Sequence, residues 1–123
     1  MEPKELALAL AEVLHDRQAE DIVLLDVEQL VGYTSYFLVA SGRNERQVRA
    51  LADHLERSGR GAGLRPLGKE GVDKGQWALI DYGDVVVHLF RNDERNYYDL
   101  ESLWGEAPSE VYPGPEGTEA APE

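Results

Sequence analysis

The first part of the chain alternates apolar and polar positions in a way that predicts one helix and two strands. Apolar residues recur every three or four positions between residues 3 and 17, which predicts an amphipathic helix packed on a sheet or, alternatively, a partner-binding helix. Residues 22–27 and 36–40 are short apolar runs typical of buried strands. Because no helix fits between these two runs, we expect them to pair as antiparallel neighbours.

A second amphipathic helix begins after Asn44, which is a natural N-cap with Gln47 three residues further on. Its apolar positions are Val48, Leu51, Ala52 and Leu55. The opposite face carries Arg46, Arg49, Arg57 and Arg60. At about 100° per residue these arginines fall within roughly 60° of one another. They predict either a solvated face or a contact with RNA phosphates or an acidic partner.

The pattern then changes to short strands and turns. Residues 64–67 predict an edge strand, because their proline is tolerated only at the edge of a sheet. Residues 68–76 are rich in glycine and charge and predict an exposed loop. Residues 77–82 and 85–90 are apolar runs separated only by Gly83-Asp84, which predicts a tight β-hairpin.

The end of the chain divides into a short helix and a polar segment. Residues 94–104 predict a short helix or helical turns. Residues 106–123 combine prolines, glycines and glutamates with almost nothing to bury, which predicts a disordered acidic tail. We therefore expect one domain over residues 1–105, with an α/β fold whose mixed sheet of about five strands is flanked by helices.

Composition narrows the class of protein. The chain has 123 residues, no cysteine and a net charge of −12. Cysteine-based catalysis and thiolate metal sites are therefore excluded, and we expect a cytoplasmic address. No apolar run approaches the roughly 18 residues that a membrane span needs. The acidic balance disfavours DNA as a partner and favours a basic protein.

Three residues of the hairpin are candidates for chemistry. Asp81, Asp84 and His88 could serve a metal-dependent nucleotidyl- or phosphoryl-transfer enzyme, because Mg²⁺ prefers oxygen ligands. The Gly-Ser phosphate loop expected beside such a site is missing from the sequence. Asp84 is also a common turn residue, and a lone histidine in an apolar strand is typical of a core residue satisfied by a neighbour. We expect no cofactor and no metal.

The hairpin also offers a binding surface. Trp77, Leu79 and Asp81 alternate onto one face of the first strand. We expect these residues, with Tyr82, to contact a protein partner, with Trp77 and Leu79 as apolar anchors and Asp81 facing a partner cation. Tyr82 falls on the opposite face and joins them only if the turn at Gly83 twists it outward. The pattern leaves open whether Trp77 lies in the core or in the interface.

The hairpin run is long and unusual: Trp77-Ala78-Leu79-Ile80-Asp81-Tyr82-Gly83-Asp84-Val85-Val86-Val87-His88-Leu89-Phe90. It is accompanied by Asp26-Val27, Tyr36-Phe37-Leu38-Val39-Ala40-Ser41-Gly42, Arg46-Gln47-Val48-Arg49-Ala50, Glu70-Gly71, Arg95, Tyr98, Leu100-Glu101 and Leu103-Trp104. Together, over about residues 3–105, these runs resemble the ribosomal silencing factor family, also called RsfS or Iojap.

This resemblance implies a nucleotidyltransferase-like fold without catalysis. It implies a translational repressor, not an enzyme, that binds the large ribosomal subunit through its ribosomal protein fourteen. The bound factor would block joining of the small and large subunits. Many members of the family carry an aspartate where this chain has Ser35, and loss of that acid further weakens a catalytic interpretation.

The resemblance also implies a homodimer. The first helix is long and apolar for so small a domain, which favours the same interpretation. We expect its Leu6 and Leu10, with Leu67 of the predicted edge strand, to form the contacts between copies.

Overall fold

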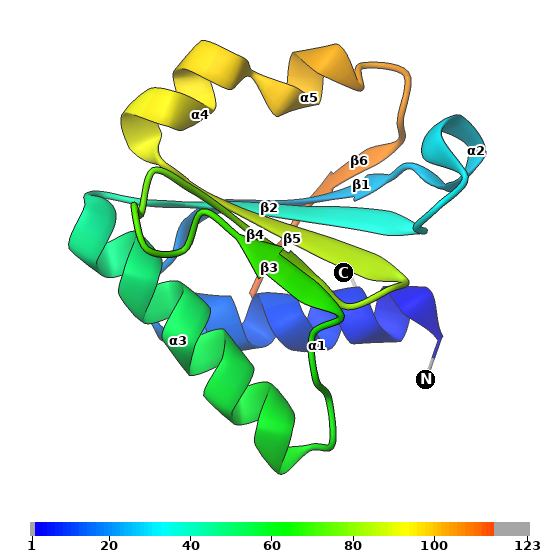
Figure 1. The fold of residues 1–123 in the computed structure, drawn as a ribbon. Coiled ribbons are helices and arrows are strands. Elements are labelled where there is room, and N and C mark those ends of the chain that lie inside the picture. The colour runs from blue at the N-terminus through cyan, green and yellow to red at the C-terminus, as the bar shows by residue number, and fades with distance from the viewer. Residues whose placement is uncertain (1, 115–123) are drawn as a thin grey trace, which may run out of the picture.

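A mixed β-sheet of six strands forms the centre of the computed structural model, which describes residues 2–114 (Figure 1). The strands are β1 (Glu20–Asp26), β2 (Tyr36–Gly42), β3 (Gly68–Glu70), β4 (Trp77–Asp81), β5 (Val85–Arg91) and β6 (Ser109–Val111). Their order across the sheet is β3-β4-β5-β2-β1-β6. Only β2 and β5 run parallel to each other. The predicted mixed sheet is confirmed, with one strand more than expected.

The helices cover the two faces of the sheet unequally. They are α1 (Pro3–Asp16), α2 (Glu28–Val31), α3 (Glu45–Gly61), α4 (Asn92–Tyr98) and α5 (Leu100–Leu103). The two long helices α1 and α3 lie on one face, and the short α4 and α5 lie on the other (Figure 1). The predicted helix over 94–104 is divided in two, because Asp99 adopts a left-handed conformation with φ of 50°.

Side-chain alternation along the central strands produces two apolar clusters. Val85, Val87 and Leu89 of β5 point toward α1 and α3, where they join the larger cluster. Val86 and Phe90 point toward α4 and α5 and join the smaller one. Buried side chains therefore fill both faces of β5, apolar except for His88, as expected for a central strand covered on both sides.

The predicted strand pairings are confirmed. β1 and β2 pair antiparallel, with Leu24 opposite Leu38. β4 and β5 form the expected hairpin, with Leu79 opposite His88. The turn between them is held by the Asp81 carboxylate, whose Oδ1 accepts a hydrogen bond of 2.7 Å from the Gly83 N–H.

The predicted edge strand over 64–67 is displaced. The edge strand is β3, which begins at Gly68, directly after the predicted range, and lies in the segment expected to be a loop. Pro66 has no N–H to give to a ladder. Regular pairing starts only after the Leu67 N–H donates to the Asp81 carbonyl at 2.7 Å.

The expectation of a disordered tail from residue 106 is wrong for the described part of that segment. β6 pairs antiparallel with β1, and Tyr112 is buried against α1, where its ring meets His15 at 5.8 Å between centroids. β1 would otherwise present unpaired backbone groups along its outer edge. The ordered domain therefore reaches at least Gly114, and residues 115–123 lie outside the described residues.

The dimer contacts expected on the first helix are also corrected. Leu6 and Leu10 are buried against the sheet of their own chain, so neither side chain is available to a second copy. Leu67 is 77% exposed and remains a candidate. Among residues 2–114 no helix is long and apolar enough to cross a membrane.

Candidate docking face

Three residues of β4 lie on the sheet face that the short helices only partly cover. Trp77, Leu79 and Asp81 share this face, as predicted, and each is half-buried. Trp77 and Leu79 pack against the smaller apolar cluster. We call these three side chains, together with Tyr98 of α4, the docking face.

Trp77 is held on three sides by aromatic neighbours. Its indole stacks on Phe90 with ring centroids 4.9 Å apart and meets Tyr98 at 4.6 Å. Its Nε1–H donates to Nδ1 of His88 at 3.1 Å. Trp77 is therefore neither a fully buried core residue nor a free surface residue, because part of its ring is packed and part remains exposed.

His88 acts as an internal acceptor. It is only 4% exposed, and burial lowers its pKa to about 4. Because Nδ1 accepts from Trp77, the neutral ring carries its proton on Nε2, which has no hydrogen-bond partner among the described residues. The interpretation of His88 as a core residue satisfied by a neighbour fits this geometry at Nδ1.

The two aspartates of the proposed enzyme site take structural roles in the turn. The Asp81 carboxylate accepts from the Gly83 N–H. The backbone carbonyl of Asp84 accepts from the N–H groups of Ser35 and Tyr36 at 3.0 and 3.1 Å. Within residues 2–114 no three His, Asp or Glu side chains are grouped so as to hold a metal ion. Asp81 and His88 are therefore engaged elsewhere through their side chains, whereas Asp84 is engaged only through its backbone and its side chain is exposed.

Tyr82 does not belong to the docking face. It lies on the other side of the sheet and packs against the larger cluster, near Gly59 of α3. Burial, with a smaller contribution from Glu56, raises the pKa of its phenol to about 12. The turn at Gly83 does not rotate Tyr82 outward, so its assignment to the partner contact is corrected.

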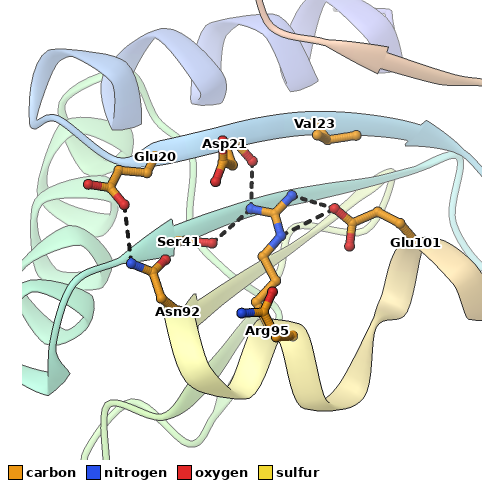
Figure 2. Close-up of a pocket in the computed structure, with 8 residues that line it drawn as sticks. Glu20, Asp21, Val23, Ser41, Asn92, Arg95 and Glu101 are labelled. Atoms are coloured by element: carbon orange, nitrogen blue, oxygen red, sulfur yellow. Dashed lines mark hydrogen bonds and ion pairs between the residues drawn. The ribbon is translucent and has the colours of Figure 1, made fainter.

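The sequence analysis gave no role to Arg95, which fixes α4 and α5 over the sheet. Its buried guanidinium donates to the Asp21 carbonyl at 2.6 Å, to Ser41 Oγ at 2.8 Å and to the Glu101 carboxylate at 2.5 and 3.2 Å (Figure 2). These bonds fix the position of α4 on the sheet, and Tyr98 of α4 therefore lies beside Trp77. The place of Arg95 in an otherwise polar helical segment gave no signal of burial.

These residues line a polar hollow of about 510 Å³ (Figure 2). Besides the bonds of Arg95, Asn92 donates to Glu20 across the hollow at 3.2 Å. The polar groups there are bound mainly to one another, which fits a structural anchor.

The four arginines predicted on the second helix are all exposed along α3. Arg57 is paired with Asp53 one turn earlier. Arg46, Arg49 and Arg60 form no ion pair with any residue that the structure describes. α3 lies on the face of the sheet opposite to the docking face (Figure 1).

The fold and this face define a small α/β domain with a six-stranded mixed sheet and one partly open sheet face. The family model described as "Ribosomal silencing factor during starvation" matches residues 1–123. The chain belongs to this ribosomal silencing factor family.

Individual proteins agree with the family model. A ribosomal silencing factor RsfS of Bacillus subtilis is 42% identical over 108 residues, which cover 88% of this chain and 92% of that protein. A chloroplastic Iojap protein of Arabidopsis thaliana is 36% identical over 82% of this chain and 42% of its own length. A crystal structure of a Chromobacterium violaceum protein superposes with a TM-score of 0.82 at 41% identity, covering 85% of this chain and 88% of that one.

Proposed function

We propose that this protein is a cytoplasmic translational repressor that binds the large ribosomal subunit through its ribosomal protein fourteen and blocks subunit joining. Membership of the ribosomal silencing factor family supports a ribosome-associated silencing role. The observation that carries the finer proposal is the docking face itself. Trp77 is an aromatic anchor, of the kind enriched at the centre of protein interfaces, and it is only half-buried in the isolated chain.

The docking face suits a protein partner with positive charge. Leu79 adds apolar area beside Trp77, and Asp81 contributes a carboxylate on the same strand. Exposed Asp93 and Asp99 lie on or next to α4. Ribosomal proteins are typically basic, and this arrangement would favour association with such a partner over association with an acidic one.

Steric blocking needs no catalytic residue. A contact of the usual size, about 800 Å² per partner, would cover roughly a ninth of the 7070 Å² surface of the chain. Most of the domain would then project from the subunit surface and obstruct a neighbour. The transferase alternative is not supported, because the Asp81 and His88 side chains are engaged in the turn and the core, and no three His, Asp or Glu side chains of residues 2–114 are grouped to hold a metal ion.

Co-sedimentation with purified large subunits tests the binding step. We expect the wild-type protein to migrate with large subunits and the Trp77→Ala variant to remain largely at the top of the gradient. Leu103→Ala is the matched control, because Leu103 is 69% exposed on α5 and lies outside the docking face. Wild-type protein that stays at the top would contradict the proposal.

Adding small subunits to the same mixture tests the blocking step. We expect the wild-type protein to reduce the fraction of joined ribosomes in proportion to its occupancy of large subunits. Full occupancy with normal joining would retain the binding step and reject the block.

A further inference from the structure

The acidic residues of α3 are all neutralised within the chain. Glu45 binds Arg91 at 2.5 Å, Glu56 binds Lys69 at 3.0 Å, and Asp53 pairs with Arg57. Two of these three cations come from other elements, β5 and β3. Two thirds of the negative charge of the helix is therefore compensated from other elements, while three of its own four arginines form no ion pair with a described residue.

Two of those arginines, together with Arg43 just before the helix, gather at the beginning of α3. Arg43, Arg46 and Arg49 are exposed, and none forms an ion pair with a residue in the described range 2–114. Within the described part of the chain, their guanidinium groups form one hydrogen bond, a long one of 3.5 Å from Arg49 to the Asp73 carbonyl. We call these three side chains the arginine cluster.

Charge is unevenly distributed along the chain. Arg43, Arg46, Arg49, Arg57, Arg60 and Arg65 are half of the twelve lysines and arginines of a protein whose net charge is −12. A positive side chain at the start of α3 faces the positive end of the helix dipole, which is unfavourable for the helix. The arginine cluster therefore opposes the local electrostatics of the helix.

The arginine cluster lies beside the segment that leads into the docking face. Gly75 approaches α3 so closely that a Cβ there would lie 2.7 Å from the Glu45 carbonyl oxygen. Two residues later the chain reaches Trp77. Figure 1 shows the first turn of α3 next to the loop between β3 and β4. α3 lies on the other face of the sheet, but this loop connects the edge at the arginine cluster to Trp77. A partner that extends past the docking face along this loop would reach the arginine cluster.

We propose that Arg43, Arg46 and Arg49 contact phosphates of ribosomal RNA when the docking face is seated on the large subunit. The inference rests on the proposed function, because it is docking that brings RNA within reach. Guanidinium groups match phosphate oxygens in charge and geometry. An overall acidic domain also needs local cations where it approaches RNA, since its net charge is otherwise repelled. An acidic protein segment as the occupant is an outcome of the test.

The salt dependence of binding measures this contact. We would titrate full-length wild-type protein and the Arg46→Gln/Arg49→Gln double variant with purified large subunits across a series of potassium chloride concentrations. Each lost phosphate contact lowers the steepness of log K against log salt by about 0.7–0.9. For two contacts we expect a reduction of about 1.4–1.8, equivalent to about a tenfold smaller loss of affinity between roughly 50 and 200 mM salt.

Arg60→Gln/Arg65→Gln is the matched control. Both residues are exposed and carry no ion pair with a described residue, so the charge change is identical at the other end of α3. We expect the control to keep the wild-type slope. We also expect both double variants to bind isolated ribosomal protein fourteen with wild-type affinity and to melt no lower than the wild type.

The remaining outcomes contradict the inference in distinguishable ways. A wild-type slope for Arg46→Gln/Arg49→Gln rejects the phosphate contacts and leaves the proposed function intact. An equal loss in the control indicates bulk electrostatics. A loss of affinity for the isolated ribosomal protein identifies a protein occupant. Wild-type protein that fails to bind large subunits would reject the proposed function and this inference together.

Discussion

Two side chains, Trp77 and His88, determine the orientation of the indole in the docking face and which of its groups a partner can contact. A tryptophan at an interface normally needs an acceptor for its indole N–H when water is removed. Here that acceptor is Nδ1 of His88, which lies inside the same chain. The exposed part of Trp77 is therefore free to make purely apolar contact, and the ring is already oriented before a partner arrives.

Replacing Trp77 should affect binding and folding to different extents. We expect Trp77→Ala to weaken binding to the large subunit by about 2 kcal/mol or more, as for a central interface anchor. Because Trp77 is only half-buried, its loss should cost less stability than the roughly 3–5 kcal/mol of a fully buried aromatic residue. Thermal unfolding and titration of large subunits on one preparation would measure both. A folded variant that binds like the wild type would remove Trp77 from the interface.

His88 should make the folded state sensitive to acid. Burial lowers its pKa from 6.5 to about 4. At a pH between these two values, the imidazole is therefore protonated in the unfolded chain and neutral in the folded chain. The free energy of unfolding should therefore decrease as the pH falls from about 6.5 to 4, by up to about 3 kcal/mol from this residue, and stay level above about pH 7.

Comparison with His88→Gln isolates this effect from the titration of carboxylates. Glutamine offers an acceptor to Trp77 but does not titrate, so the difference in unfolding free energy between wild type and variant should shrink as the pH falls. Parallel pH profiles for the two proteins would show that His88 does not titrate on unfolding in this range.

At the scale of elements, the segment that carries β6 should contribute measurably to the free energy of unfolding. Tyr112 follows β6, is 8% exposed and donates its N–H to the Ile22 carbonyl at 2.8 Å. We expect Tyr112→Ala to lower the free energy of unfolding by about 2–3 kcal/mol, measured by chemical denaturation. Val111→Ala is the control, because Val111 is 70% exposed and should change stability by less than about 0.5 kcal/mol. Equal stabilities would show that packing of the Tyr112 side chain does not stabilise the segment that carries β6.

The elements that sequence analysis predicted well share one property: their signal is local. The helix after Asn44 has a cap and a clear period, and the Asn44 side chain does accept from the Gln47 N–H at 2.9 Å. The hairpin carries its own turn at Gly83. β6 has no such signal, because it depends on the open edge of β1, which lies far away in sequence. Arg95 was missed for the same reason, since its partners lie up to 74 positions away.

At the scale of the whole molecule, the edge of the sheet at β3 is a candidate contact between two copies of the chain. With Leu6 and Leu10 buried, the remaining candidate is Leu67, which precedes the short edge strand β3. We propose a homodimer that contacts through this edge. Light scattering at tens of micromolar should give twice the chain mass of 13.7 kDa, and Leu67→Asp should restore the single mass. A single mass for the wild-type protein would reject the dimer.

The anchoring of Arg95 has a consequence for how the chain folds during synthesis. Asp21 has a left-handed φ of 51°, a conformation unfavourable for a residue with a Cβ, and its carbonyl is held by a guanidinium 74 positions later. The β1–β2 pair can form early, yet this bent stretch receives its restraint only after residue 95 has left the ribosome. Contacts between such distant residues form slowly. The closing of α4 and α5 should therefore be a late step of maturation, followed by the pairing of β6 with β1, so a nascent chain would expose Trp77 and Phe90 more fully than the finished protein does.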